Sequence, residues 1–331
     1  MILLFNFLYL LIVFEVRVEI STLLCYNVEE SGSDIMSKTD NVNGYEGKKT
    51  INWYPGHMAK TKREIAEKLN LIDVVYEVID SRMPYSSKIV DIEDLIKDKP
   101  RILVMTKYDL CDEEETNKFV KHYEDNGYKV VTVDLMSNNN NGVKKIIDAT
   151  NELMVEVNKK RAEKGMMPRA GRVLIVGIPN AGKSTLINRL VGRKAAGVGN
   201  TPGFTKSLSW IRINKDLELL DSPGILWPKL EDQEAAHVLA SLSSIKEEIL
   251  NIDDIAIFIL KKMFELYPEK LEERYGITEL DDDLIETYDL IASRRGALSR
   301  GGVADYEKVS GIIVKDLKNG YFGKITLDRL K

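Results

Sequence analysis

The sequence has 331 residues, of which 44% are hydrophobic and 30% are charged, and its formal net charge is −5. This composition is typical of a globular protein and excludes a largely disordered chain. A negative net charge excludes a general attraction to nucleic acid, so we expect no DNA partner and only local contacts with RNA. The two cysteines, Cys25 and Cys111, have neither paired nor metal-ligand spacing. We therefore expect a reducing compartment, the cytoplasm, or the mitochondrion only if the source is eukaryotic.

The first 49 residues are predicted to be an extension that is disordered or not translated. Residues 1–14 are almost entirely apolar, but this run is shorter than a membrane span and is followed by Glu15. It also lacks the flanking features of a signal peptide. A polar stretch begins at Met36, which is a second possible start of translation. A buried strand or a peripheral membrane contact remains the alternative, but we expect no stable membrane association.

Residues 50–229 alternate short β-branched runs with amphipathic stretches, which predicts an α/β domain with a three-layer, doubly wound sheet. The predicted strands are residues 73–79, 101–105, 129–133, 172–176, 207–213 and 217–220. The predicted helices are residues 112–126, 142–160 and 183–190. After Pro228 the strand pattern stops, and residues 230–331 are predicted to form a small all-α domain.

Residues 177–184 read G-I-P-N-A-G-K-S and match the pattern of a phosphate-binding loop. The apolar run before them and the helical pattern after them supply the strand and helix that this loop requires. Backbone N–H groups would wrap the phosphates, the lysine would neutralise them, and Ser184 would bind Mg²⁺. The expected phosphate-binding residues are Pro179, Asn180, Ala181, Gly182, Lys183, Ser184 and Thr185.

Two later segments have the order expected of nucleotide-sensing switches. Residues 221–224 read D-S-P-G after an apolar strand, which places Asp221 where it can hold Mg²⁺ and Gly224 where it can turn toward the γ-phosphate. Between this segment and the phosphate loop lies a turn-rich stretch, residues 199–205. Within it Thr205 is the candidate Mg²⁺ ligand, with Thr201 as the reserve.

Residues 106–109 read T-K-Y-D and resemble the N-K-x-D element with which GTPases read guanine. Asp109 would accept hydrogen bonds from guanine N1–H and the exocyclic amine, which adenine does not present. Lys107 would support it, while Thr106 replaces the usual asparagine. Met136 and Ser137, after the next strand, would support the base through their backbone. Both elements precede the phosphate loop, so the GTPase order is circularly permuted.

With these motifs, the chain resembles the YlqF family of circularly permuted GTPases, mitochondrial relatives included, over residues 51–330. Further matching segments are N-W-Y-P-G-H-M-A-K at 52–60, D-S-R-M-P at 80–84 and L-L-D-S-P-G-I-L-W-P at 219–228. The resemblance implies binding of GTP and GDP, and a switch in late assembly of the large ribosomal subunit that binds its precursor and rRNA. No role for Asp80 or Arg82 can be derived from the sequence.

Many GTPases place a glutamine after the second-switch glycine, but here that residue is Ile225, which cannot orient water. The resemblance implies His57 as the catalytic residue and Asn180 as a ligand of K⁺, whose charge would aid hydrolysis; capping or turn formation is the alternative for both. Two other functions stay open. A P-loop ATPase or phosphotransferase acting on a small molecule would leave Asp109 unexplained, and a membrane-attached regulator would rest on residues 1–14 alone.

Overall fold

The computed structural model describes residues 56–96, 99–137, 139–167, 169–193, 196, 207–225, 232–245 and 250–330, with the side chains of residues 56, 57, 90 and 91 also left out. Residues Thr50–Lys331 form one compact unit. The expectations for residues 1–49, and for the second start at Met36, lie outside the described residues. None of the described helices is long and apolar enough to cross a membrane.

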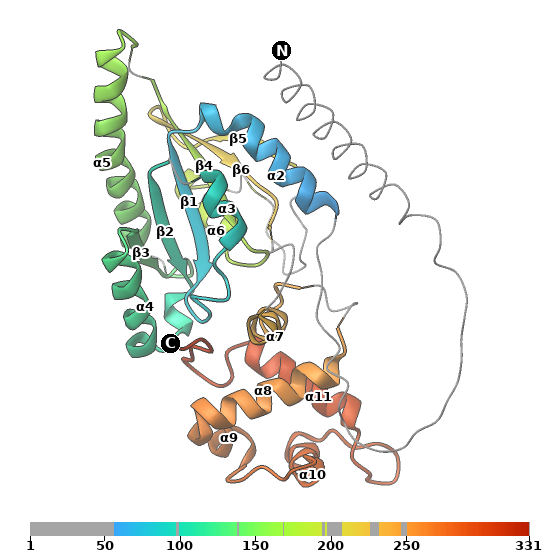
Figure 1. The fold of residues 1–331 in the computed structure, drawn as a ribbon. Helices are drawn as coiled ribbons and strands as arrows, with labels where there is room; N and C mark the ends of the chain where they lie inside the picture. The colour runs from blue at the N-terminus through green and yellow to red at the C-terminus, as the bar shows by residue number, and fades with distance from the viewer. Residues whose placement is uncertain are drawn as a thin grey trace, which may run out of the picture. The chain divides into compact units, whose positions relative to one another are not determined.

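A six-stranded sheet forms the centre of the fold (Figure 1). Its order is β3-β2-β1-β4-β6-β5, and the only antiparallel pair among these strands is β5 with β6. All seven residues of β1 are buried, as expected of a central parallel strand covered on both faces. The strands are β1 (Val74–Asp80), β2 (Arg101–Thr106), β3 (Lys129–Val133), β4 (Gly171–Gly177), β5 (Ser209–Arg212) and β6 (Leu217–Asp221).

Helices cover both faces of this sheet. On one face, Phe119 and Tyr123 of α4 pack with Leu103 and Met105 of β2. On the other face, the hydroxyl of Tyr76 in β1 lies 2.5 Å from Thr150 Oγ1 in α5. The helices of this part are α2 (Gly56–Lys68), α3 (Val90–Ile96), α4 (Glu113–Asp125), α5 (Asn141–Glu163) and α6 (Lys183–Val191), with short 3₁₀ turns η1 (Leu69–Leu71) and η2 (Tyr108–Leu110). The predicted three-layer α/β fold is confirmed.

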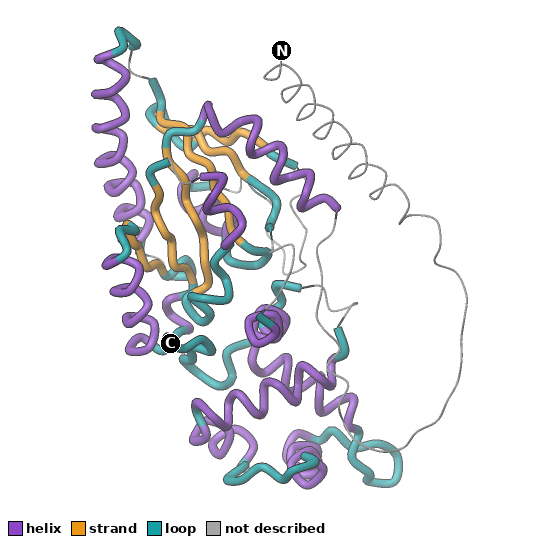
Figure 2. Tube along the Cα trace, viewed as in Figure 1, coloured by secondary structure: helices purple, strands orange, loops and turns teal. Residues whose placement is uncertain are grey.

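The part of the chain after the sheet is helical, and Figure 2 shows no strand in its described portion. It contains α7 (Gln233–Ser241), α8 (Ile252–Leu266), α9 (Pro268–Tyr275), α10 (Ile285–Arg295) and α11 (Tyr306–Lys318). Side chains of Asp232, Asn251 and Asp305 accept hydrogen bonds from the first turns of α7, α8 and α11, which explains why these helices begin there. The domain boundary between residues 229 and 230 stays a prediction.

Candidate nucleotide site

The phosphate loop, residues 177–184, connects β4 to the N-terminus of α6 at the centre of the sheet. A Cβ atom on Gly177 would lie 2.4 Å from the carbonyl oxygen of Val78 in β1, so only glycine fits beside that strand. Asn180 and Gly182 have φ values of 61° and 92°, a left-handed conformation that recurs in the backbone turns of anion-binding loops. The role of this loop in phosphate binding stays a prediction.

Lys183 and Asp221 are the two charged groups buried at this loop. Lys183 Nζ donates hydrogen bonds of 2.9 and 2.8 Å to the carbonyl oxygens of Gly177 and Ile178. Burial lowers the pKa of Lys183 to about 8, although the nearby charge of Asp221 opposes this shift. Burial likewise raises the pKa of Asp221 to about 6, against the charge of Lys183. Burial thus disfavours the charged form of both groups, and a bound partner of opposite charge would stabilise that form.

The residues at the end of β6 fit a divalent cation. Asp221 is 3% exposed, and its Oδ1 atom is buried without a hydrogen-bond partner among the described residues. A desolvated carboxylate oxygen of this kind is a hard ligand, as Mg²⁺ prefers. Ser184, in the first turn of α6, would supply the hydroxyl ligand of such a site. The third expected ligand, Thr205, lies outside the described residues, as does Thr201.

The base-reading segment contacts the phosphate loop directly. Thr106 Oγ1 lies 2.6 Å from the carbonyl oxygen of Ala181 and 3.0 Å from that of Ile79. Lys107 has a left-handed backbone, with φ of 56°, and its Nζ atom donates a 2.7 Å hydrogen bond to the carbonyl oxygen of Asn180. The two segments that the sequence separates by about 70 residues therefore lie side by side. The threonine at position 106 still ties the two loops together although the amide is missing.

Asp80 explains why the D-S-R-M-P segment accompanies these motifs. This residue ends β1, is fully buried, and its Oδ2 atom accepts hydrogen bonds of 2.7 Å from Lys107 Nζ and 2.8 Å from Arg82. Burial alone would raise the pKa of Asp80, but the charges of Arg82 and Lys107 outweigh it and hold that pKa well below its usual range. The carboxylate is therefore ionised and fixes Lys107 between β1 and the phosphate loop.

Asp109 lies in η2, where a second carboxylate is close by. Burial raises the pKa of Asp109, and the neighbouring Asp134 adds to the shift. Asp134 Oδ1 accepts backbone hydrogen bonds from Met136 (2.7 Å) and Ser137 (3.0 Å), which shapes the predicted base-supporting turn. Arg189 of α6 donates to the carbonyl oxygens of Leu135 and Ser137, at 2.9 and 2.6 Å. Sequence reasoning missed Asp134 and Arg189, because only the fold brings α6 beside the end of β3.

The second-switch segment packs against the phosphate loop. A Cβ atom on Gly224 would lie 2.7 Å from the backbone nitrogen of Pro179, so the close approach depends on glycine. Ile225 is 3% exposed, and its N–H donates a 3.2 Å hydrogen bond to the carbonyl oxygen of Gly177. A buried isoleucine at this position cannot orient an attacking water, as the sequence indicated. His57 lies in the first turn of α2, but its side chain is not described.

Asn180 makes a contact that the sequence did not predict. Its Nδ2 atom donates a 2.6 Å hydrogen bond to the carbonyl oxygen of Ser243, which follows α7 in the helical part. Ser243 has a positive φ of 63°, a left-handed conformation that is rare for serine. The phosphate loop and the helical part are therefore joined by a direct bond. The amide oxygen of Asn180 is the group that the K⁺ expectation requires.

This geometry defines a circularly permuted P-loop GTPase, and comparison with known proteins identifies the family. A family model described as "50S ribosome-binding GTPase" matches residues 172–293. "Ribosome biogenesis GTPase A" of Priestia megaterium is 43% identical over 84% of this chain and 96% of that protein. "Mitochondrial ribosome-associated GTPase 1" of Ictalurus punctatus is 30% identical over 88% of this chain and 97% of that protein. The chain belongs to the ribosome biogenesis GTPase A family, also called the YlqF family.

A solved structure agrees with this assignment. GNP-bound YlqF from T. maritima superimposes with a TM-score of 0.57 and 27% sequence identity, covering 82% of this chain and 98% of that one. The predicted fold and the predicted family are both confirmed, and the individual site residues stay predictions.

Proposed function

We propose that this protein is a GTP-hydrolysing switch that acts in late assembly of the large ribosomal subunit. The contact of the base-reading segment with the phosphate loop, through the pairs Thr106–Ala181 and Lys107–Asn180, carries the proposal. It creates one site for a guanine nucleotide from two segments whose chain order is inverted. Asp109 is the group that would distinguish guanine from adenine.

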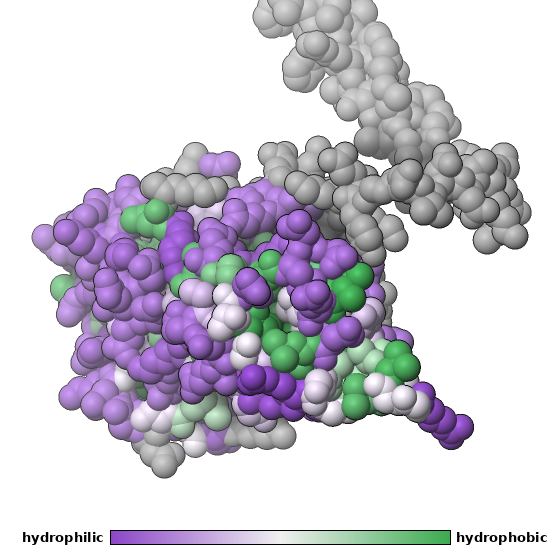
Figure 3. All heavy atoms as spheres, turned by 90° about the horizontal axis from the view of Figure 1, so that it is seen from below, coloured by the Kyte–Doolittle hydropathy of each residue, from purple (hydrophilic) through white to green (hydrophobic). Residues whose placement is uncertain are grey.

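The names of its relatives, ribosome biogenesis GTPase A and mitochondrial ribosome-associated GTPase 1, support a ribosomal partner. We place the contact with rRNA on the helical part. Among its arginines, Arg295 lies 3.9 Å from Asp316 within the fold, whereas Arg300 lies in an exposed turn. Figure 3 shows a largely hydrophilic face on which hydrophobic residues gather in one region. The exposed large hydrophobic residues described in the helical part are Ile252, Ile285, Leu298, Val303, Tyr306, Tyr321 and Leu330.

Each residue of the site would have a separate role in binding or hydrolysing the nucleotide. Lys183 and the N–H groups at the start of α6 would hold the β- and γ-phosphates. Bound Mg²⁺, held by Ser184, Asp221 and Thr205, would supply positive charge to those phosphates. His57 would orient the attacking water, because Ile225 cannot. Asn180 would offer its amide oxygen to K⁺.

A P-loop ATPase or phosphotransferase is the second candidate. It would use the same phosphate loop, but it would give no reason for the aspartate at position 109 or for the contact of Lys107 with the phosphate loop. Membership of a GTPase family also argues against it. We place the protein in the cytoplasm, or in the mitochondrion if its source is eukaryotic.

The proposal is tested by measuring phosphate release from GTP and from ATP, with and without purified large-subunit precursor particles. Each reaction is run in K⁺ and again in Na⁺ at equal ionic strength. We expect hydrolysis of GTP alone, stimulated by the particles and faster in K⁺. Equal turnover of ATP, or GTP turnover indifferent to the particles, would contradict the assigned function. Equal rates in the two salts would contradict only the role of Asn180 in holding K⁺.

A further inference from the structure

The chain returns from the helical part to the nucleotide site after α11. Residues 325–328, which we call the C-terminal strap, lie across the loops that follow β1 and β2. The N–H of Ile325 donates a 3.1 Å hydrogen bond to the carbonyl oxygen of Leu110, and the N–H of Leu327 donates a 2.7 Å bond to that of Arg82. The side chains of Ile325 and Leu327 are each 2% exposed. The strap is thus hydrogen-bonded to two loops, one that follows β1 and one that follows β2.

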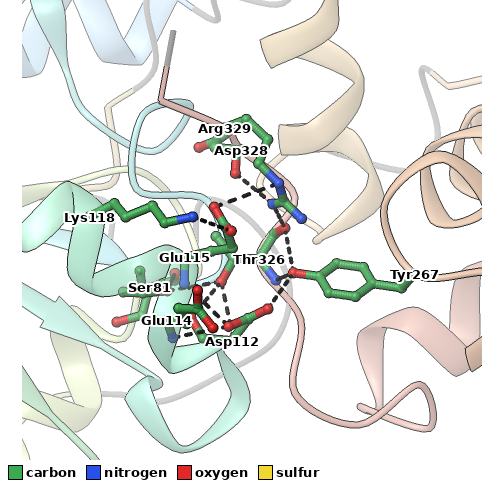
Figure 4. Close-up of polar contacts among 10 residues, drawn as sticks. Ser81, Asp112, Glu114, Glu115, Lys118, Tyr267, Thr326, Asp328 and Arg329 are labelled. Atoms are coloured by element: carbon green, nitrogen blue, oxygen red, sulfur yellow. Dashed lines mark hydrogen bonds and ion pairs between the residues drawn. The ribbon is translucent and has the colours of Figure 1, made fainter.

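Thr326 adds a third attachment, which Figure 4 shows in detail. Its hydroxyl lies 2.8 Å from Thr116 Oγ1 in α4 and accepts a 3.2 Å hydrogen bond from the N–H of Asp112. The Thr116 hydroxyl lies in turn 3.0 Å from the carbonyl oxygen of Ser81. Because Thr326 is fully buried, these bonds are shielded from water.

Asp328 closes the strap with a buried carboxylate. Its Oδ2 atom accepts hydrogen bonds of 2.8 Å from the N–H groups of both Tyr85 and Ser86, and its Oδ1 atom accepts a 2.6 Å bond from the Ser86 hydroxyl. A buried carboxylate costs free energy unless it is hydrogen-bonded, so these three donors hold the strap in place. An asparagine could keep all three contacts, because its oxygen would accept from the two N–H groups and its amide would donate to Ser86.

Tyr267, at the junction of α8 and α9, joins the strap to the helical part. Its hydroxyl lies 3.1 Å from Asp112 Oδ2 and 3.1 Å from the carbonyl oxygen of Thr326, and it accepts a 3.0 Å bond from the N–H of Thr326. The single hydroxyl proton can go to either oxygen. One side chain of the helical part therefore contacts the strap and the start of α4 together (Figure 4).

Two of the attachment points, Leu110 and Arg82, are linked to the base-reading groups Asp109 and Lys107. Leu110 directly follows Asp109 in the chain. Arg82 lies two residues after Asp80, to which it is bonded and which in turn holds Lys107. We propose that the C-terminal strap positions Asp109 and Lys107 for guanine, so that the helical part sets the affinity for the base. This inference rests on the proposed guanine specificity and gives Thr326 and Asp328 the role of positioning residues.

The test compares GDP with inosine diphosphate. The base of inosine diphosphate lacks the exocyclic amine from which Asp109 would accept a hydrogen bond. Affinities for the two nucleotides are measured by calorimetry on the whole chain. We expect the wild type to prefer GDP by about tenfold or more, the value of one charge-assisted hydrogen bond. Asp328→Ala and Thr326→Val should bring that ratio close to one, whereas Asp328→Asn should keep it.

A general loss of stability would weaken the binding of GDP and of inosine diphosphate equally, and it would leave the ratio of the two affinities unchanged. Val309→Ala, at a fully buried position of α11, supplies the matched control for this effect. If Asp328→Ala fails to fold, Thr326→Val still decides the question, because it replaces the hydroxyl with a methyl group of similar size. An unchanged ratio in the strap variants that fold overturns the inference while guanine specificity stands. A wild type that binds both nucleotides equally overturns the assigned contact of Asp109 with the exocyclic amine, and the inference with it, whereas the proposed function fails only if ATP is turned over as well as GTP or if the particles have no effect.

Discussion

The ammonium group of Lys107 lies 2.7 Å from Asp80 Oδ2 and 2.7 Å from the carbonyl oxygen of Asn180. One side chain therefore connects the end of β1, the base-reading loop and the phosphate loop. Since β1 lies between β2 and β4 in the sheet, Asp80 is the anchor that the topology offers to this lysine. Asp80 is fully buried, whereas the Lys107 side chain is 26% exposed, so solvent reaches only the lysine side of this ion pair.

Asp80→Asn should weaken guanine-nucleotide binding and destabilise the fold. The change leaves Arg82 and Lys107 buried without their shared negative charge, which typically costs about 3 to 5 kcal/mol. Thermal unfolding and GDP affinity measure the two effects. Asp73→Asn is the matched control, because Asp73 pairs with Arg169 just before the opposite end of β1 in a more exposed setting. A GDP affinity in Asp80→Asn as high as in Asp73→Asn would show that the pair does not position Lys107.

Lys183→Ala should abolish nucleotide binding while the sheet stays folded. The lysine is the single positive side chain that the phosphate-loop motif places on the β- and γ-phosphates. Calorimetric titration with GDP measures the loss, and circular dichroism checks the fold. Lys262→Ala, on α8, removes a lysine that is paired with Glu234 in the helical part and should bind GDP normally. Binding in Lys183→Ala within tenfold of wild type would contradict the assigned role.

His57→Ala should spare GTP binding but remove the stimulation of turnover by ribosomal particles. General base or water-orienting groups typically contribute about 10² to 10⁴ in rate, so the loss should be at least a hundredfold in the stimulated reaction. Single-turnover hydrolysis at saturating particle concentration measures it. The neighbouring Lys60→Ala serves as a control on the same helix. Normal stimulation in the His57 variant would show that another residue orients the attacking water.

Asp328 should make the fold more stable as the pH is lowered from 7 toward 4. Burial raises the pKa of Asp328 to about 6, from 3.8 for the free side chain, although the bonds from Ser86 and Tyr85 oppose the shift. In the unfolded chain the carboxyl ionises first, so at pH 7 the folded state carries a penalty, up to about 3 kcal/mol, that disappears at low pH. Asp328→Asn should therefore raise the melting temperature at pH 7 and lose that advantage near pH 4. If the melting temperatures of Asp328→Asn and the wild type differed by the same amount from pH 7 to pH 4, the raised pKa of Asp328 would be refuted.

Much of the nucleotide site was visible in the sequence because its motifs are local. The glycines, Lys183 and Asp221 stand at fixed distances from strand ends, and parallel strands bring those ends to one edge of the sheet. The permuted order of the motifs could also be read directly. Helices α2 and α3 were missed, and α3 has only seven residues, too few for a clear period.

The contacts between distant segments could not be predicted. Nothing local to Asp80 shows that its partner is Lys107, and nothing local to Asp328 shows that it meets Ser86, 242 residues away. Such pairs depend on which strands are neighbours and on where the helical part returns to the sheet. Their only sequence signal is a charged residue at the end of an otherwise apolar run, which more often marks a turn.

The central place of β1 has a consequence for synthesis of the chain. Strands β1, β2 and β3 and their helices leave the ribosome first, but β4, the second neighbour of β1, begins only at Gly171. Until then the inner edge of β1 exposes unpaired backbone beside mostly apolar side chains, a state prone to pair with other chains. At about 5 to 20 residues per second, the 90 or so residues between them take roughly 5 to 20 seconds to appear. A nascent half-sheet of this kind is a natural client for a chaperone.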